Sequence, residues 1–192
     1  MLQPNYPEME IRRIETIGPK VGDELKTSAL QAILIALGLV LIYITFRFQW
    51  RQGIAAIITL LHDVMVVVGL FSIFDKEFTL PVIAALLTVV GYSLNDTIVI
   101  FDRIRENISK FRKRELLPLI NQSVTETLSR TLLTSGTTLM VVLALVFLGG
   151  EIIHDFAFAL LVGVLIGTYS SIYVASPTVL WLTKIAPPKT SD

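Results

Sequence analysis

The sequence contains five stretches of almost wholly apolar residues, and this feature restricts the possible fold more than any other. A helix rises about 1.5 Å per residue, so that a stretch of about 20 residues crosses a hydrocarbon core of about 30 Å. The alternation of apolar and polar residues that is typical of the strands of a membrane β-barrel is absent. We therefore predict an all-α integral membrane protein with five transmembrane helices. They are expected at residues 28–46, 54–74, 79–101, 128–148 and 156–182.

The composition agrees with this prediction and excludes several other classes of protein. Hydrophobic residues make up 53% of the 192-residue chain and charged residues 17%, whereas about 25% of the residues in a soluble domain are charged. The 16 basic and 16 acidic residues cancel, which excludes a nucleic-acid binder driven by net positive charge. The chain has no cysteine for a disulfide scaffold, and its polar start shows no cleavable signal.

The connections between the stretches differ in their content of lysine and arginine. These residues gather at residues 47–53 and 103–127 and in the tail at residues 184–192, and they are scarce in the other two connections. Basic loops resist translocation, so these segments and the C-terminus are predicted to be cytoplasmic, and residues 1–27 extracytoplasmic. Residues 1–27 are themselves partly basic. We therefore expect a native chain that begins earlier, although the first apolar stretch alone is an alternative means of carrying them across.

The connection at residues 103–127 is too long and too basic for a simple turn. Its apolar residues recur at loosely helical spacing and are interrupted by Pro118. This pattern predicts that the third helix continues beyond the membrane and is followed by an amphipathic elbow at the cytoplasmic surface. We expect the basic run at residues 110–114 to lie against anionic lipid headgroups. The alternative is a docking surface for a protein partner.

Asp96 is the most informative polar residue inside the apolar stretches. A charge at the centre of a membrane costs at least about 2.5–3.5 kcal/mol, so such a residue normally faces other helices or a hydrated cavity. Asp96 precedes Asp102 by six residues, which places it about 9 Å inside the cytoplasmic end of its helix. A polar stripe lies beside it at helical spacing, formed by Thr88, Tyr92 and Asn95. We interpret Asp96 as a group that binds and releases protons; the alternative is a structural carboxyl held by hydroxyl groups.

Arg130 is the candidate cation for Asp96. It lies near the start of the fourth stretch, which runs opposite to the third, so that both residues fall in the same half of the membrane. Thr134 follows on the same helix face. We predict a pair between Asp96 and Arg130, direct or through water. In the alternative, Arg130 only extends to the membrane surface.

His62 and Asp63 interrupt the second stretch near its midpoint. Adjacent residues of a helix point about 100° apart, so we expect these two side chains not to share one face closely. The pair has poor spacing for a metal, and no metal site is predicted. We interpret Asp63 as a buried carboxyl bonded to a neighbouring helix. In the fifth stretch, Gly163 and Gly167 form a small-xxx-small pattern that predicts close helix packing, and Pro177 predicts a kink.

The sequence gives no sign of an enzyme. It has no phosphate-binding loop, dinucleotide fingerprint or nucleophile elbow. Asp63 and Asp96 lie in successive spans, as in an intramembrane aspartyl protease. That chemistry requires both carboxyls to reach one water molecule, and the different depths of Asp63 and Asp96 in the membrane argue against it.

One segment is long and specific enough to indicate a family. Residues 90–107, Val-Gly-Tyr-Ser-Leu-Asn-Asp-Thr-Ile-Val-Ile-Phe-Asp-Arg-Ile-Arg-Glu-Asn, resemble the SecF family of protein-export membrane proteins, which act with SecD. Four further segments resemble the same family in the expected order, at residues 21–25, 60–64, 129–135 and 163–171. The resemblance covers nearly the whole chain.

This resemblance implies a fold related to the proton-driven RND transporters. Each SecF unit would have a six-helix bundle, of which this chain would hold helices two to six, without the first helix and most of the periplasmic domain. Residues 1–27 would then be the end of that domain. The resemblance also implies a location in the bacterial cytoplasmic (inner) membrane.

The function implied by the resemblance is promotion of protein export by use of the proton gradient. The implied partners are SecD, the SecYEG channel and the translocating unfolded protein, with YajC and YidC as further candidates. Asp96 matches the proton-path carboxylate of the family, and Arg130 matches the basic residue of the following helix. Protons and the membrane potential would act in place of a cofactor. The alternatives are an RND-type proton-coupled antiporter of small molecules and a structural scaffold for SecD.

Overall fold

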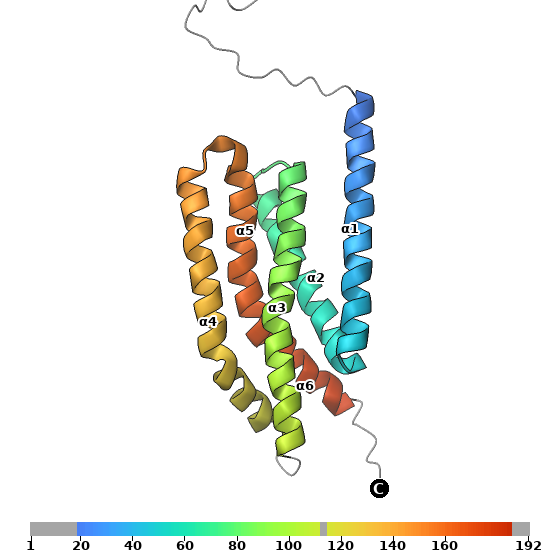
Figure 1. The fold of residues 1–192 in the computed structure, drawn as a ribbon, viewed down its shortest axis with the longest axis vertical. Coiled ribbons are helices and arrows are strands. Elements are labelled where there is room, and N and C mark those ends of the chain that lie inside the picture. Colours follow the sequence, from blue (N-terminus) through green and yellow to red (C-terminus); the bar gives the residue numbers. More distant parts are fainter. Residues whose placement is uncertain (1–18, 112–114, 186–192) are drawn as a thin grey trace, which may run out of the picture.

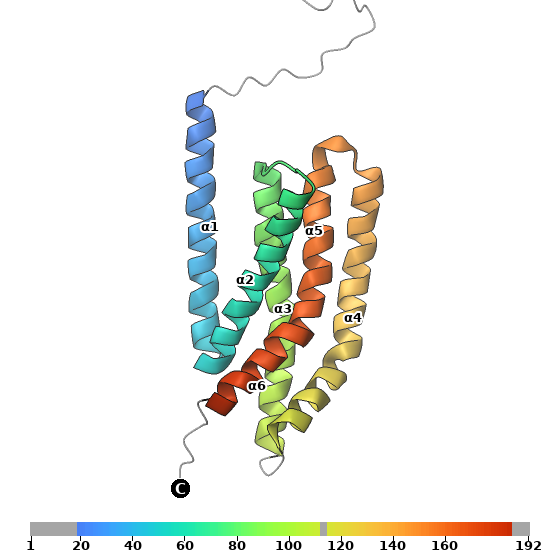
Figure 2. The same ribbon diagram turned by 180° about the vertical axis from the view of Figure 1, so that it is seen from behind.

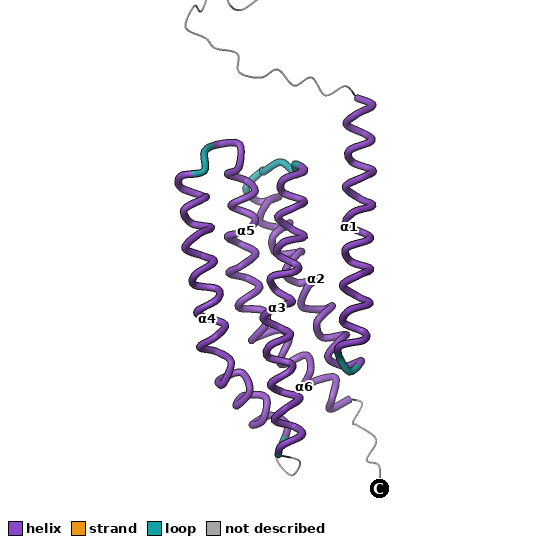
Figure 3. Tube along the Cα trace, viewed as in Figure 1, coloured by secondary structure: helices purple, strands orange, loops and turns teal. Residues whose placement is uncertain are grey.

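The computed structural model describes residues 19–111 and 115–185, and this part of the chain is almost entirely helical (Figure 3). The helices follow one another with short connections, as expected where backbone polar groups must be satisfied inside a membrane. They are α1 (Pro19–Arg47), α2 (Trp50–Ile73), α3 (Leu80–Lys110), α4 (Leu116–Leu148), α5 (Glu151–Ser170), a π-helical segment (Ser171–Ala175) and α6 (Ser176–Ile185).

Four helices in the described part are long and apolar enough to cross a membrane. They are α2, α3, α4 and the continuous helix Glu151–Ile185, which agrees with four of the predicted spans. The first predicted span, at residues 28–46, falls within α1, whose apolar stretch is the shorter segment Leu34–Ile44. A membrane-crossing role for α1 therefore stays a prediction.

The predicted elbow is built from the ends of two long helices. Helix α3 continues to Lys110, and α4 already begins at Leu116, so nearly all of residues 103–127 extend spanning helices. Figure 1 shows the first turns of α4 slanting toward the end of α3. Pro118 lies in the first turn of α4, where its missing N–H has no helical acceptor to lose. Of the predicted lipid-facing run at residues 110–114, residues 112–114 lie outside the described part.

Helix α5 is the centre of the bundle. It packs against α2, α3 and α4, whereas α1 stands at the edge and contacts α2 and α3 (Figures 1 and 2). Gly150, with φ of 73°, makes the turn that brings α5 back beside α4. The π-helical segment follows α5 directly, ahead of Pro177, and α6 leaves it in a new direction beneath α2 (Figure 2).

The connections rich in basic residues all meet at one end of the bundle, which we call the basic end. It contains Arg47 at the end of α1, Arg51 at the start of α2, Lys110 at the end of α3 and Lys184 near the end of α6. The connections from α2 to α3 and from α4 to α5 lie at the opposite end (Figure 1). The fold therefore sorts the connections as their charges predict.

Candidate functional site

Asp96 lies inside the bundle and points toward α4. Only 2% of its surface is exposed. Ser135 Oγ donates a hydrogen bond to Asp96 Oδ2 across a distance of 3.4 Å, which is long for such a bond. The third span thus turns its carboxyl toward a neighbouring helix, away from lipid.

Ser135 connects Asp96 to a short chain of hydroxyl groups from three helices. Tyr92 of α3 donates its hydroxyl to Ser135 Oγ at 3.3 Å. Thr168 Oγ1 of α5 lies 2.7 Å from Ser135 Oγ and also 2.7 Å from the carbonyl oxygen of Val164. A threonine hydroxyl has a single proton, so Thr168 has a choice of two acceptors.

That choice allows the chain of hydroxyls to serve both forms of Asp96. When Asp96 is ionised, Thr168 donates to Ser135, and Ser135 donates to the carboxylate. When Asp96 is neutral, it donates to Ser135, Ser135 donates to Thr168, and Thr168 donates to Val164 O. Each hydroxyl of the group formed by Tyr92, Ser135 and Thr168 keeps an acceptor in both states, which avoids a cost of about 1–3 kcal/mol per unsatisfied group.

Arg130, on α4, makes no direct contact with Asp96. Its side chain is exposed, and in the described part of the chain it forms no ion pair with Asp96 within 4 Å. The predicted direct pair is therefore wrong, because Arg130 sits more than one turn before Ser135, nearer the basic end. A connection through water, the other form of the prediction, stays a prediction, and so does the alternative that Arg130 only extends to the membrane surface.

Arg130 faces a polar groove between α3 and α4 at the basic end. The groove has a volume of about 620 Å³. Its lining residues are Asn95, Ile98, Val99, Asp102, Arg103, Glu106, Glu126, Thr127 and Arg130. Thr131, which follows Arg130 and lies one turn before Ser135, is 1% exposed, and its hydroxyl has no partner among the described residues. A buried hydroxyl thus stands between the groove and Asp96.

The other polar residues that were predicted near Asp96 and Arg130 have separate roles. Asn95 is exposed and lines the groove. Thr88 is exposed and donates to the carbonyl oxygen of Ala84 in its own helix. Thr134 likewise donates to backbone carbonyls of α4. Of the stripe, only Tyr92 joins the chain of hydroxyls at Asp96.

Asp63 is a second buried carboxyl, on α2, and 1% of its surface is exposed. Ser93 Oγ of α3 donates to Asp63 Oδ2 at 2.5 Å, and Ser170 Oγ of α5 donates to the same oxygen at 2.8 Å. His62 Nδ1 lies 2.9 Å from Asp63 Oδ1, so these neighbouring side chains meet, a contact that was not expected from their directions on the helix. Their Cα–Cβ bonds diverge, but the rotamer of His62 turns its imidazole ring back toward the carboxyl.

Gly163 and Gly167 lie where α5 crosses α3. A Cβ atom on Gly163 would stand 2.0 Å from Val89 Cγ2, and one on Gly167 would stand 3.1 Å from Ser93 Cβ. Because Ser93 is bonded to Asp63, the close approach of the two helices also sets the geometry of that carboxyl. The small residues thereby position part of the polar interior.

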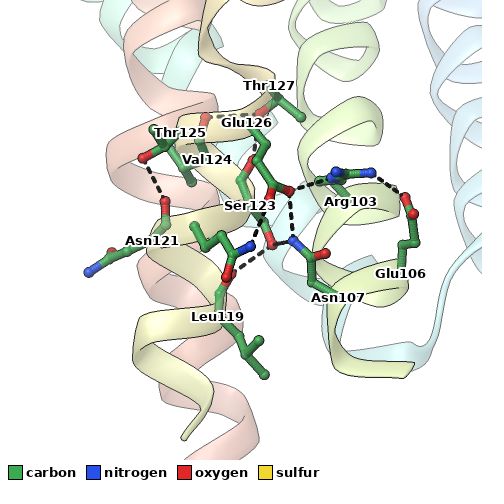
Figure 4. A network of polar contacts seen from close by, with 11 residues as sticks. Arg103, Glu106, Asn107, Leu119, Asn121, Ser123, Val124, Thr125, Glu126 and Thr127 are labelled. Carbon is green, nitrogen blue, oxygen red and sulfur yellow. Dashed lines mark hydrogen bonds and ion pairs between the residues drawn. The ribbon is translucent and has the colours of Figure 1, made fainter. Parts of the chain in front are cut away.

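A network of charged and amide groups joins α3 to α4 at the basic end (Figure 4). Arg103 Nε lies 2.5 Å from Glu126 Oε2, and Asn107 Nδ2 donates to the same oxygen at 2.9 Å. Asn107 also donates to Ser123 Oγ, and Gln122 donates to Glu126 Oε1. Glu126 precedes the predicted span, and its hydrogen bonds from Asn107, Gln122 and Arg103 lower its pKa to about 2.

Several of these residues were not expected from the sequence. Thr168 gave no signal, since a single threonine in an apolar stretch commonly bonds to its own helix. Asn107, Ser123 and Glu126 were read only as part of an amphipathic surface segment. No group of three or more histidine or acidic residues that could hold a metal ion occurs within residues 19–111 and 115–185.

Comparison with known proteins gives consistent results along the chain. Residues 1–185 match the family model described as protein export membrane protein SecD/SecF, C-terminal. Protein translocase subunit SecF of Desulfurispirillum indicum is 56% identical over 172 residues, covering 88% of this chain and 55% of that protein. SecF of Vibrio alginolyticus is 56% identical over 174 residues, covering 91% of this chain and 55% of that protein.

The larger SecDF proteins are also similar. Protein translocase subunit SecDF of Thermus thermophilus is 53% identical over 166 residues, which cover 86% of this chain and 23% of that protein. A crystal structure of SecDF in a super-membrane-facing form superposes with a TM-score of 0.79 at 49% identity, covering 88% of this chain and 23% of that one. The chain spans about half the length of the curated SecF relatives that it matches. It therefore belongs to the SecD/SecF family of protein export membrane proteins and corresponds to the C-terminal membrane region of that family.

Proposed function

We propose that this chain is the membrane-embedded part of a SecF-type subunit that promotes protein export. It acts with SecD at the SecYEG channel, with YajC and YidC as further candidate partners, on unfolded chains that cross the bacterial inner membrane. The names of the relatives, protein translocase subunits SecF and SecDF, support this assignment. The concentration of basic residues at one end supports a cytoplasmic position for that end, with the start of α1 outside.

The single observation that carries a coupling role is the position of Asp96. A carboxyl that is 2% exposed in a membrane span is costly as an anion, and here a chain of hydroxyls satisfies both its charged and its neutral form. Arg130 lines the polar groove at the basic end, and the buried Thr131 that follows it lies one turn before Ser135. This arrangement suits a carboxyl that takes up protons in one state and releases them in another.

The proposed cycle moves a proton from Asp96 to the groove. The O–H bond of the neutral Asp96 carboxyl breaks, and its proton passes to water beside Thr131. The positive charge of Arg130 then favours the carboxylate that remains. Ser135 and Thr168 then reverse their hydrogen bonds toward Asp96. The reversal changes the forces between α3, α4 and α5, which is how a proton would bias the packing of the bundle.

The energy available to such a cycle is large enough to matter. A membrane potential of 100 mV supplies about 2.3 kcal/mol for each charge that crosses the whole membrane. Since about 1.4 kcal/mol changes an equilibrium tenfold, this energy shifts a two-state packing equilibrium by about fiftyfold. Proton transfer at Asp96 therefore has enough driving force to reverse a modest preference for one arrangement of helices.

The test replaces Asp96 with asparagine, which keeps the shape and removes the titratable carboxyl group. In membrane vesicles that contain the export machinery, we expect Asp96→Asn to abolish the increase in export caused by an imposed proton gradient. Asp75→Asn is a matched control in the connection from α2 to α3, where asparagine tolerates the φ of 51°. The control should leave the increase intact.

The other outcomes separate the remaining functions. If Asp96→Asn exports as the wild type does with a gradient, the coupling role is refuted and a scaffold for SecD explains the family membership. If the variant loses proton-dependent efflux of a small molecule while export continues, the chain acts as an antiporter. Copurification of SecD and channel subunits supports the export assignment in either case.

A further inference from the structure

We propose that Asp63 and His62 form a second proton-binding site, separate from Asp96, where α2 meets α3 and α5. This inference rests on the proposed function for its role in coupling, but the site itself is argued from its own contacts. The ligand of this site is a proton on the carboxyl of Asp63, which has no part in the mechanism at Asp96.

The first argument is the way three helices converge on Asp63. The carboxyl belongs to α2, and the hydroxyls of Ser93 on α3 and Ser170 on α5 both reach its Oδ2 atom. Asp63 is 1% exposed, and Ser93 and Ser170 are fully buried. A carboxylate so enclosed, with no metal or arginine bonded to it in the described part of the chain, requires a proton or a cationic neighbour to offset its charge.

His62 can supply that charge. Its Nδ1 atom lies 2.9 Å from Asp63 Oδ1, and 35% of its side chain is exposed. With one proton shared between imidazole and carboxyl, the pair is neutral overall, either as imidazolium and carboxylate or as two neutral groups.

Ser170 provides a switch for a proton on the other oxygen of the carboxyl, Oδ2. Its Oγ atom is 2.8 Å from Asp63 Oδ2 and 3.2 Å from the carbonyl oxygen of Gly167. When Asp63 is ionised, Ser170 donates to the carboxylate. When Asp63 is protonated, its own O–H donates to Ser170 Oγ, and Ser170 donates to Gly167 O. Proton binding therefore proceeds without leaving a buried donor unsatisfied.

The surroundings of Asp63 leave His62 as its titratable partner. From α3 the facing group is the Ser93 hydroxyl, and the nearest titratable groups along that helix are Tyr92 and Asp96, both of which contact Ser135 of α4. From α5 the facing group is Ser170, while the neighbouring Tyr169 is exposed. The charges that α1 and α6 carry among the described side chains, Arg47 and Lys184, lie at the basic end.

The two carboxyl sites meet on α5. Thr168 responds to Asp96 through Ser135, and Ser170 responds to Asp63, each by turning its proton toward a carbonyl in the preceding turn of α5. The π-helical segment Ser171–Ala175 begins at the next residue. Segments of this kind break the regular hydrogen-bond ladder and occur often at functional sites. Helix α5 is thus placed to combine the protonation states of both carboxyls.

The test is infrared difference spectroscopy between acidic and neutral pH on the full chain in lipid vesicles, with any subunits that copurify. Protonated carboxyls give a separate C=O band, and buried ones exchange slowly with deuterium. We expect Asp63→Asn to remove one such band and Asp96→Asn to remove a different one. His62→Gln should retain the Asp63 band but change the pH range over which it appears.

Ser170→Ala is a second variant for the case in which Asp63→Asn fails to fold. It leaves the Asp63 carboxyl in place and removes only the hydroxyl bonded to it. It should shift the frequency of the Asp63 band, since the protonated carboxyl loses its acceptor, and leave the Asp96 band unchanged. An unchanged spectrum in both Asp63→Asn and Ser170→Ala overturns the second site. An Asp63 band without an Asp96 band refutes the proposed coupling role of Asp96 and leaves the second site standing.

Discussion

The crossing of α3 and α5 at Gly163 allows a prediction whose size follows from the structure. In Gly163→Ala the new Cβ atom would lie 2.0, 2.7 and 2.9 Å from the Cγ2, Cγ1 and Cβ atoms of Val89. Carbon atoms in contact are normally about 3.5 Å apart, so the nearest pair must separate by about 1.5 Å. Rotation of Val89 cannot achieve this, because its Cβ atom is itself too close. The helix backbones must move apart.

We expect this movement to cost about 3 kcal/mol, the upper end of the range for overpacked cores. The higher helix propensity of alanine returns about 1 kcal/mol, which leaves a net loss of about 2 kcal/mol in the free energy of unfolding. Gly91→Ala is the matched control, because no atom lies within 4 Å of its Cβ position. It should be as stable as the wild type or more so.

The assay is reversible unfolding in mixed micelles, followed by tryptophan fluorescence as denaturing detergent is added. A double-mutant cycle with Val89→Ala isolates the clash, because that variant removes both Cγ atoms. We expect Gly163→Ala to cost clearly less in the Val89→Ala background. If Gly163→Ala is as stable as Gly91→Ala, or if its cost is the same in both backgrounds, the close packing of α3 on α5 is refuted.

Two further predictions concern the polar groups. Ser135→Ala should lower the free energy of unfolding by about 1–3 kcal/mol and reduce proton-stimulated export, because Asp96 loses its partner on α4; full stability and full stimulation would contradict the chain of hydroxyls. Glu126 has a pKa lowered to about 2 by Asn107, Gln122 and Arg103, so its stabilising effect is present above about pH 4.5 and is lost as the pH falls toward 2. Wild type should therefore exceed Glu126→Gln in stability at pH 6, and the difference should vanish near pH 2; a difference that is constant over this range would exclude the network.

The burial of Asp96 illustrates what a sequence pattern can predict and where it stops. The cost of a charge in lipid requires Asp96 to face the protein interior, whatever the details of packing. Its partner could not be predicted, because that depends on the rotation of α4 about its axis. The structure presents Ser135 to Asp96 and turns Arg130 into the groove, although both residues share one helix and the same half of the membrane.

Asp63 shows the same limit at shorter range. The position of a carboxyl near the middle of α2 predicts a bond to another helix, but not to two serines that are 30 and 107 residues away in the chain. His62 was discounted from helix geometry alone, because backbone direction says nothing of the side-chain rotamer. The structure brings its ring back to the carboxyl.

The sequence by itself determined that the chain is helical, where most spanning helices lie and which connections share one end. These properties follow from length, hydropathy and loop charge, which act on each segment separately because a helix in lipid satisfies its own backbone. Only the tertiary structure decided which hydroxyls meet Asp63 and Asp96, that α5 contacts both sites, and that a π-helical segment follows them. Those features depend on the depth and rotation of one helix against another, set by contacts such as that of Gly163 with Val89.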